Sequence, residues 1–151
     1  LGPGHSVSDA IVYLPKEGVI FGGDLLFLYS TPLGTYGSFA GWINAMEAMG
    51  KLDAATYVPG HGPLCSKDGV MDSRNYLVLV RDEARKCFDK GMSTDEAVKH
   101  VNLGHYKKWA AWERILFNLE RLQREFQGEP PDSKLDEASV MMRAIALAAS
   151  G

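Results

Sequence analysis

Two short apolar runs rich in β-branched and aromatic residues open the chain, at positions 10–14 (AIVYL) and 19–21 (VIF). Residues 15–18 between them (PKEG) have turn chemistry, so the pattern predicts a β-hairpin. A third strand is predicted over 56–58, and Pro59 ends it. Because both hairpin runs are almost entirely apolar, we expect both faces of the sheet to be covered, one by helices and the other by a second sheet.

Apolar residues recur at helical spacing through most of the remaining chain. Ser38 is suited to cap the first of these helices, and Ser93 with Glu96 forms a capping box at the start of the third. The expected helices run over 39–50, from between 67 and 73 to Gly91, from 93 to about 103, over 106–126 and over 135–149.

This order of strands and helices predicts an α/β (α+β) fold, in which helices cover a small sheet and a helical extension follows at the C-terminal end. The clearest linker is the stretch GEPPD, which begins at Gly128. We therefore divide the chain into a domain over 1–127, a linker over 128–133 and a final helical segment over 134–151.

Three potential metal ligands, His5, Asp24 and His61, stand among glycines where a predicted strand begins or ends. Side chains at strand ends are held by the sheet and face open space, which suits a bound ion. Imidazole nitrogen and carboxylate oxygen are ligands for zinc, iron or manganese. The three residues match no short local motif, so a turn or surface role for the histidines is equally open on the residues alone.

Three segments resemble the second half of the metallo-β-lactamase superfamily: GPGHS over 2–6, YLPKEGVIFGGD over 13–24 and PGHG over 59–62. Members of that superfamily carry a GHT or GHS loop, a GD at a strand end and a final GHG. The resemblance is close over residues 1–63 and extends through the following helices to about 127. It implies half of an αββα sandwich.

By this resemblance the chain would bind one or two zinc ions, with iron or manganese as alternatives. His5 and His61 would be terminal ligands of two ions, and Asp24 would be the catalytic carboxylate that bridges them. Asp9 would orient a ligand imidazole; the alternative for it is an ordinary turn residue. Metal-bound hydroxide would then hydrolyse a small-molecule substrate of the ester, thioester or lactam type.

A loop over 30–37 follows the apolar run 25–29, and its place next to Asp24 suggests that it overhangs the site. Tyr29 and Tyr36 are therefore candidates for substrate binding. Packing in the core or at the rim is the alternative for either tyrosine.

The chain departs from the superfamily pattern in one respect, because it has no copy of the upstream metal-binding motif HxHxDH. We therefore expect it to be the C-terminal half of a larger fold, and whether this chain alone is an enzyme stays open. One hypothesis is a hydrolase that needs a complementing N-terminal half. The other is a catalytically inactive half-fold that serves as a binding or structural module, with its uncovered sheet face packed against a second copy in a homodimer.

Charge and composition narrow the class of partner. The net charge of -3 comes without a basic stripe, which argues against a nucleic-acid partner. No apolar run approaches the length that spans a bilayer, so we expect no membrane partner. Cys65 and Cys87 fit neither a disulfide framework nor a CxxC site, and they are typical of reduced thiols in a cytoplasmic protein.

Overall fold

A computed structural model of the protein describes residues 1–149 and has a mixed α/β fold, as the sequence predicts. Its elements in chain order are β1 (Val12–Leu14), β2 (Val19–Phe27), α1 (Phe39–Gly50), β3 (Thr56–His61), α2 (Lys67–Phe88), α3 (Thr94–His100), the 3-10 helices η1 (Gly104–Lys108) and η2 (Trp112–Arg114), α4 (Ile115–Phe126) and α5 (Glu137–Ala149).

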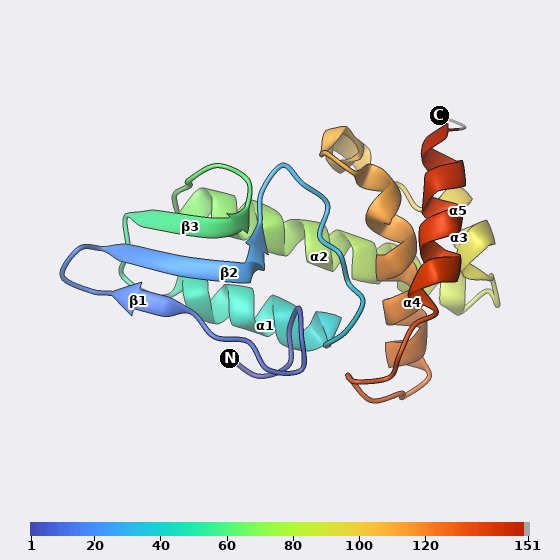
Figure 1. Cartoon of the computed structure of the whole chain (residues 1–151), viewed down its shortest axis with the longest axis horizontal. Helices are drawn as coiled ribbons and strands as arrows, with labels where there is room; N and C mark the ends of the chain where they lie inside the picture. The colour runs from blue at the N-terminus through green and yellow to red at the C-terminus, as the bar shows by residue number, and fades with distance from the viewer. Residues whose placement is uncertain (150–151) are drawn as a thin grey trace.

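The sheet has the strand order β1-β2-β3, with β1 antiparallel and β3 parallel to the central strand β2. Helices α1 and α2 lie along one face of this sheet (Figure 1). The opposite face carries Val12, Leu14 and Phe21, whose exposed fractions are 57%, 39% and 44%. Only one face of the sheet is therefore covered within residues 1–149, and the predicted cover of the second face does not come from this part of the chain.

The central strand is longer than the pattern 19–21 predicts. β2 continues through the two glycines and Asp24 to Phe27, and its pairing with β3 shifts register between Phe21 and Gly23 and again between Gly23 and Phe27. Gly23 has a φ of 53°, which glycine adopts without strain. The glycines bend the strand at this point rather than ending it, so the prediction that Asp24 stands at a strand end is wrong.

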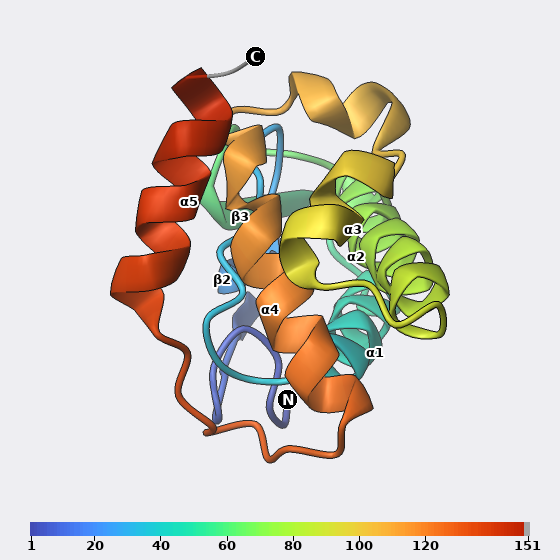
Figure 2. The same ribbon diagram turned by 90° about the vertical axis from the view of Figure 1, so that its right-hand side faces the viewer.

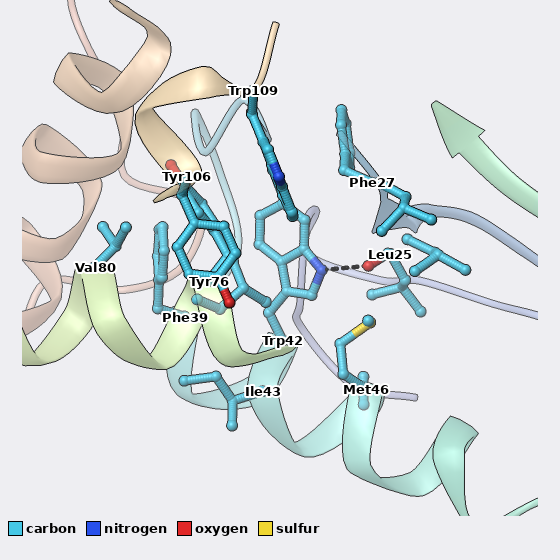
Figure 3. Packing of buried hydrophobic residues seen from close by; sticks show 14 of the residues in the cluster. Leu25, Phe27, Phe39, Trp42, Ile43, Met46, Tyr76, Val80, Tyr106 and Trp109 are labelled. Atoms are coloured by element: carbon cyan, nitrogen blue, oxygen red, sulfur yellow. Dashed lines mark hydrogen bonds between the residues drawn. The ribbon is translucent and has the colours of Figure 1, made fainter. Parts of the chain in front are cut away.

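Helix α1 joins the sheet to the rest of the core. Ser38 caps it as predicted, with its hydroxyl accepting a hydrogen bond from the Gly41 amide. Trp42 and Phe39 extend from α1 toward Tyr76 and Tyr106 on one side and Leu25 and Phe27 on the other (Figure 3). Because both aromatic residues are almost fully buried, α1 carries a large share of the core between the sheet and α2.

The predicted helix over 106–126 is not continuous. It is replaced by η1, a break at residues 109–111, η2 and α4. At the break the Ala110 amide donates to the Tyr29 carbonyl and the Thr31 amide donates to the Ala110 carbonyl. Ala111 has a φ of 55°, outside the helical region. Hydrogen bonds to the loop after β2 thus replace the helical bonds that the apolar spacing alone predicts.

The C-terminal helices form a layer in which α4 lies between α3 and α5 (Figure 2). The predicted capping box of Ser93 and Glu96 is present at the start of α3. Arg121 of α4 is fully buried and donates to the carbonyls of Pro130 and Ser133, which holds the linker against α4. The predicted segment 134–151 contains α5, and its last two residues lie outside the described ones.

Candidate functional site

Asp24 and His61 come together because β2 and β3 are parallel neighbours in the sheet. His61 Nε2 lies 3.5 Å from Asp24 Oδ1, and each side chain is 49% exposed. The His61 ring stacks on Phe27, with ring centroids 4.4 Å apart and an interplanar angle of 15°. The pair is thus supported from the protein side by a buried phenyl ring and stays open to solvent on the other side.

The two glycines of the PGHG segment have no side chain, and this makes the close contact between Asp24 and His61 possible. A Cβ atom on Gly60 would lie 2.3 Å from Asp24 Oδ1, and one on Gly62 would lie 2.1 Å from the Leu28 carbonyl oxygen. The Leu28 amide also donates to the His61 carbonyl. The Asp24 carboxylate therefore rests against bare backbone, a place that only glycine leaves free.

Asp9 organises the loop that carries His5. Its carboxylate accepts hydrogen bonds from the Gly4 amide at 2.8 Å and from both the amide and the hydroxyl of Ser6. These donors lie on both sides of His5 in the chain. The contacts are those of a turn residue, which was one of the two interpretations of Asp9, and through them the carboxylate fixes the backbone at His5.

The His5 ring lies edge-on to Trp42 at 5.1 Å between ring centroids and 5.8 Å from the centroid of Phe27. Trp42 Nε1–H donates to the Leu25 carbonyl oxygen at 2.7 Å (Figure 3). Both predicted imidazole ligands therefore neighbour the same phenyl ring, and Trp42 links the His5 loop to the residue that follows Asp24.

The structure brings the three predicted ligands into one region but does not arrange them around one point. Among residues 1–149, no group of three or more His, Cys, Asp or Glu side chains is placed to hold a metal ion. Asp24 and His61 fit a cation as a pair, because one oxygen and one nitrogen donor face each other at a half-exposed position beside Gly60. His5 is adjacent to that pair through Phe27.

The two candidate tyrosines lie in different surroundings. Tyr29 is 59% exposed, has a φ of 59° and comes directly after Leu28, which binds the His61 carbonyl. Tyr36 lies near Glu137 of α5, and the interaction with this carboxylate raises the pKa of the Tyr36 phenol. Non-glycine residues with positive φ are uncommon and concentrate at functional sites, which singles out Tyr29.

Sequence reasoning missed the contribution of Phe27 and Trp42 to this site. Both fall in apolar patterns that predict core positions, and both are indeed buried. Their contacts with the imidazoles depend on how α1 packs against β2, which leaves no signal in the local sequence. Gly60 comes directly before the predicted ligand His61. The presence of a glycine at that position was the signal that sequence reasoning could have used.

Comparison with known proteins identifies a family for part of the chain. Residues 1–61, which include all three predicted ligands, match the family described as the metallo-beta-lactamase superfamily. No curated protein matches the chain.

Several solved structures share part of the fold. The sec-alkylsulfatase Pisa1 from Pseudomonas sp. is 16% identical with a TM-score of 0.64, and the alignment covers 87% of this chain and 24% of that one. A double mutant of the same sulfatase gives 17% identity and a TM-score of 0.67 over the same shares. The metallo-beta-lactamase FIM-1 from Pseudomonas aeruginosa is 26% identical with a TM-score of 0.46, covering 50% of this chain and 36% of that one.

The small sheet covered by helices on one face, with Asp24 and His61 on neighbouring strands, is consistent with a partial metallo-β-lactamase fold. Residues 1–61 match the metallo-β-lactamase superfamily, and the chain shares part of the fold of the solved sulfatase. It spans about a quarter to a third of the length of the solved relatives described above. The match of residues 1–61 to this superfamily supports a hydrolase family.

None of the helices within residues 1–149 combines the length and apolar character needed to cross a membrane.

Proposed function

We propose that this chain supplies part of the active site of a metal-dependent hydrolase that acts on an ester, thioester or lactam-type small molecule. The observation that carries the proposal is the approach of His61 Nε2 to Asp24 Oδ1, 3.5 Å apart and half-exposed, within the segment that matches the superfamily. The chemistry of the donors supports zinc, with iron or manganese as alternatives.

In this proposal His5 and His61 would each donate one nitrogen, and Asp24 its carboxylate, to a site of one or two metal ions. The remaining ligands would come from a complementing N-terminal half. When bound, the ions lower the pKa of a coordinated water and polarise the bond under attack.

The chain's own residues would hold and orient these donors. Phe27 stacks beneath His61 and keeps water from one face of the imidazole. Gly60 leaves space for the Asp24 carboxylate, and Asp9 fixes the backbone on both sides of His5. These supports reduce the number of orientations available to each donor, which favours binding.

Tyr29 would contact the substrate from the rim. Its side chain is exposed and its backbone is held in an unusual conformation by the bond between its carbonyl and the Ala110 amide. Tyr36 was predicted for the same role, but it is less exposed than Tyr29, at 37%, and it interacts with Glu137 of α5. We therefore assign substrate contact to Tyr29 alone.

Metal analysis of the purified chain tests the proposal. Equilibrium dialysis against zinc should show binding to the wild-type chain that Asp24→Asn and His61→Ala both weaken strongly. His100→Ala is the matched control, because the His100 Nδ1 atom is already bonded to the Glu96 carbonyl within α3. Zinc binding that is the same in wild type and in both site variants would contradict the proposal.

A second candidate function is a catalytically inactive binding or structural module, and the open sheet face favours it. Val12 and Phe21 are direct partners in the β1–β2 register, and Phe21 is opposite Val58 of β3. They form an apolar row across the sheet with no cover in residues 1–149. For this module we propose a second copy of the chain as the occupant, because the exposed apolar row at Val12 and Phe21 can pack against the same row of another copy, sheet to sheet.

Light scattering of the purified chain distinguishes the possible occupants. A chain that stays monomeric until the complementing half is added would support that half as the occupant. A stable dimer of the chain alone would instead assign this face to a second copy. Zinc binding by neither state would leave the module as the better description.

The cysteines support a reducing compartment for the protein, and we propose the cytoplasm. Cys65 and Cys87 are both free thiols, and burial raises the pKa of each. Protonated thiols react slowly with disulfides, so neither is suited to a redox role.

A further inference from the structure

Helix α1 obtains the negative charge at its N-terminus from a distant part of the chain. Its own first turn contains no acidic residue. Instead, the Glu125 carboxylate of α4 accepts hydrogen bonds from the Phe39 amide at 2.7 Å and from the Ala40 amide at 3.2 Å. A carboxylate at this position satisfies amides that the helix leaves unpaired and complements the helix dipole.

Ser38 connects this carboxylate to the His5 loop. Its hydroxyl donates to Glu125 Oε1 at 3.0 Å and accepts from the Gly41 amide. Its own amide donates to the Gly4 carbonyl at 3.0 Å. One residue therefore joins the end of α4, the start of α1 and the residue before His5.

The contact between α1 and the His5 loop is too close for either part to move independently. A Cβ atom on Gly41 would lie 1.9 Å from the Pro3 carbonyl oxygen, and one on Gly37 would lie 2.0 Å from the Gly4 carbonyl oxygen. The backbones are thus in direct contact over this stretch. A shift at the start of α1 has to be passed to the His5 loop.

We infer that Glu125 is a positioning residue, which fixes the His5 loop for metal binding through Ser38 and the first turn of α1. The inference rests on the proposed function, and it extends the site to a helix outside residues 1–61, the segment that matches the superfamily. Glu125 itself touches neither a metal nor a substrate in this arrangement.

The substitution Glu125→Gln tests the inference, because it replaces the carboxylate by an uncharged amide and keeps the shape of the side chain. The carboxylate accepts three hydrogen bonds, from the Ser38 hydroxyl and from the Phe39 and Ala40 amides. An amide has one accepting oxygen, so its NH₂ group must face an N–H donor in either orientation. We expect the start of α1 and the His5 loop to loosen, and zinc affinity to fall by about tenfold.

Glu47→Gln is the matched control. Glu47 also lies on α1 and carries one negative charge, but its carboxylate binds Arg74 of α2 and not the N-terminus of the helix. Loss of general charge or of α1 stability would affect both variants. Only Glu125→Gln should weaken zinc binding.

Hydrogen exchange gives a readout that does not depend on metal. In the metal-free chain, Glu125→Gln should accelerate exchange of the Gly4 and Ser38 amides, and Glu47→Gln should leave it unchanged. Unchanged exchange in Glu125→Gln would overturn the inference. If the wild-type chain binds no zinc while exchange responds as expected, the proposed function fails and the positioning of the loop by Glu125 stands.

A double-mutant cycle with His5→Ala shows whether Glu125 acts through His5. In the His5→Ala background, Glu125→Gln should cause no further loss of zinc affinity, because the group that it positions is absent. Equal losses in the two backgrounds would show a general effect on the protein and would overturn the inference.

Discussion

The indole of Trp42 joins the two halves of the candidate metal site, because its Nε1–H donates to the Leu25 carbonyl and its ring meets the His5 imidazole edge-on. Leu25 follows Asp24 directly in β2. The hydrogen bond is 2.7 Å long and buried, so it is shielded from competition by water. A residue that the sequence pattern assigns to the core thus also sets the relation between His5 and Asp24.

Replacement of Trp42 by Phe should destabilise the chain and weaken zinc binding together. The ring contact is partly kept, but the Leu25 carbonyl loses its partner in a buried position, which costs about 1–3 kcal/mol. Urea unfolding and zinc titration measure the two effects. Trp112→Phe is the control, since Trp112 is only partly buried and is a cation–π partner of Lys107. Equal effects of the two substitutions would contradict this role for Trp42.

Gly60→Ala should reduce zinc affinity, on the order of tenfold, with a smaller effect on stability. The added methyl group would overlap Asp24 Oδ1 and the backbone of Gly23, so the carboxylate has to move. Gly50→Ala serves as the comparison, because there the methyl group meets only the flexible end of Met71. Zinc titration of both variants should show a loss for Gly60→Ala alone.

The free energy of unfolding should fall as the pH rises above 10. Burial raises the pKa of Tyr76 above its ordinary value of 10.0, and the pKa of Tyr106 is also raised, first by burial. Each phenol binds its proton more tightly in the folded state. Its stabilisation is therefore complete below the pKa of the unfolded chain and is lost as the pH rises toward the folded value.

Urea unfolding at pH values from about 9 to 11 measures this effect. The variant Tyr76→Phe should show a weaker dependence on pH, although it is less stable overall because the Asn118 side chain loses its bond to the Tyr76 hydroxyl. A wild-type unfolding free energy that stays constant over that range would contradict the prediction.

Arg143→Gln should release α5 from α3 and α4. The Arg143 guanidinium binds Asp95 of α3 and Glu120 of α4, and its side chain is 30% exposed. We expect a loss of about 1 kcal/mol and faster hydrogen exchange over residues 137–149. Arg85→Gln is the control. It removes the exposed ion pair between Arg85 of α2 and Asp89 at the end of the same helix, and it should leave α5 unaffected.

Phe21→Gln should weaken association through the open sheet face without loss of stability. The Phe21 side chain is 44% exposed and lies in the row with Val12 and Val58. Leu64→Gln is the control, since Leu64 is exposed outside the strands. Light scattering should show weaker association for Phe21→Gln only. No difference between the variants would place the interface elsewhere.

The local sequence was sufficient to predict the elements that are fixed by hydrogen bonds and turns between residues close together in the chain. The hairpin, the cap at Ser38 and the capping box of Ser93 and Glu96 form within a few residues of chain, and the structure has all of them. The α/β class is also readable from the order of strands and helices, and the resemblance of GPGHS and PGHG to the superfamily agrees with the family match over residues 1–61. Local hydrogen bonds and backbone conformations need no distant partner to form.

Tertiary structure decided what the local pattern left open. The break at Ala110 and Ala111 follows from hydrogen bonds to the loop after β2, which a helical spacing of tryptophans does not reveal. The support of His5 by Trp42 and Glu125 likewise joins residues far apart in the chain. Asp24 meets His61 only because β3 pairs in parallel with β2, so sequence alone named the donors and the packing of the sheet determined which of them meet.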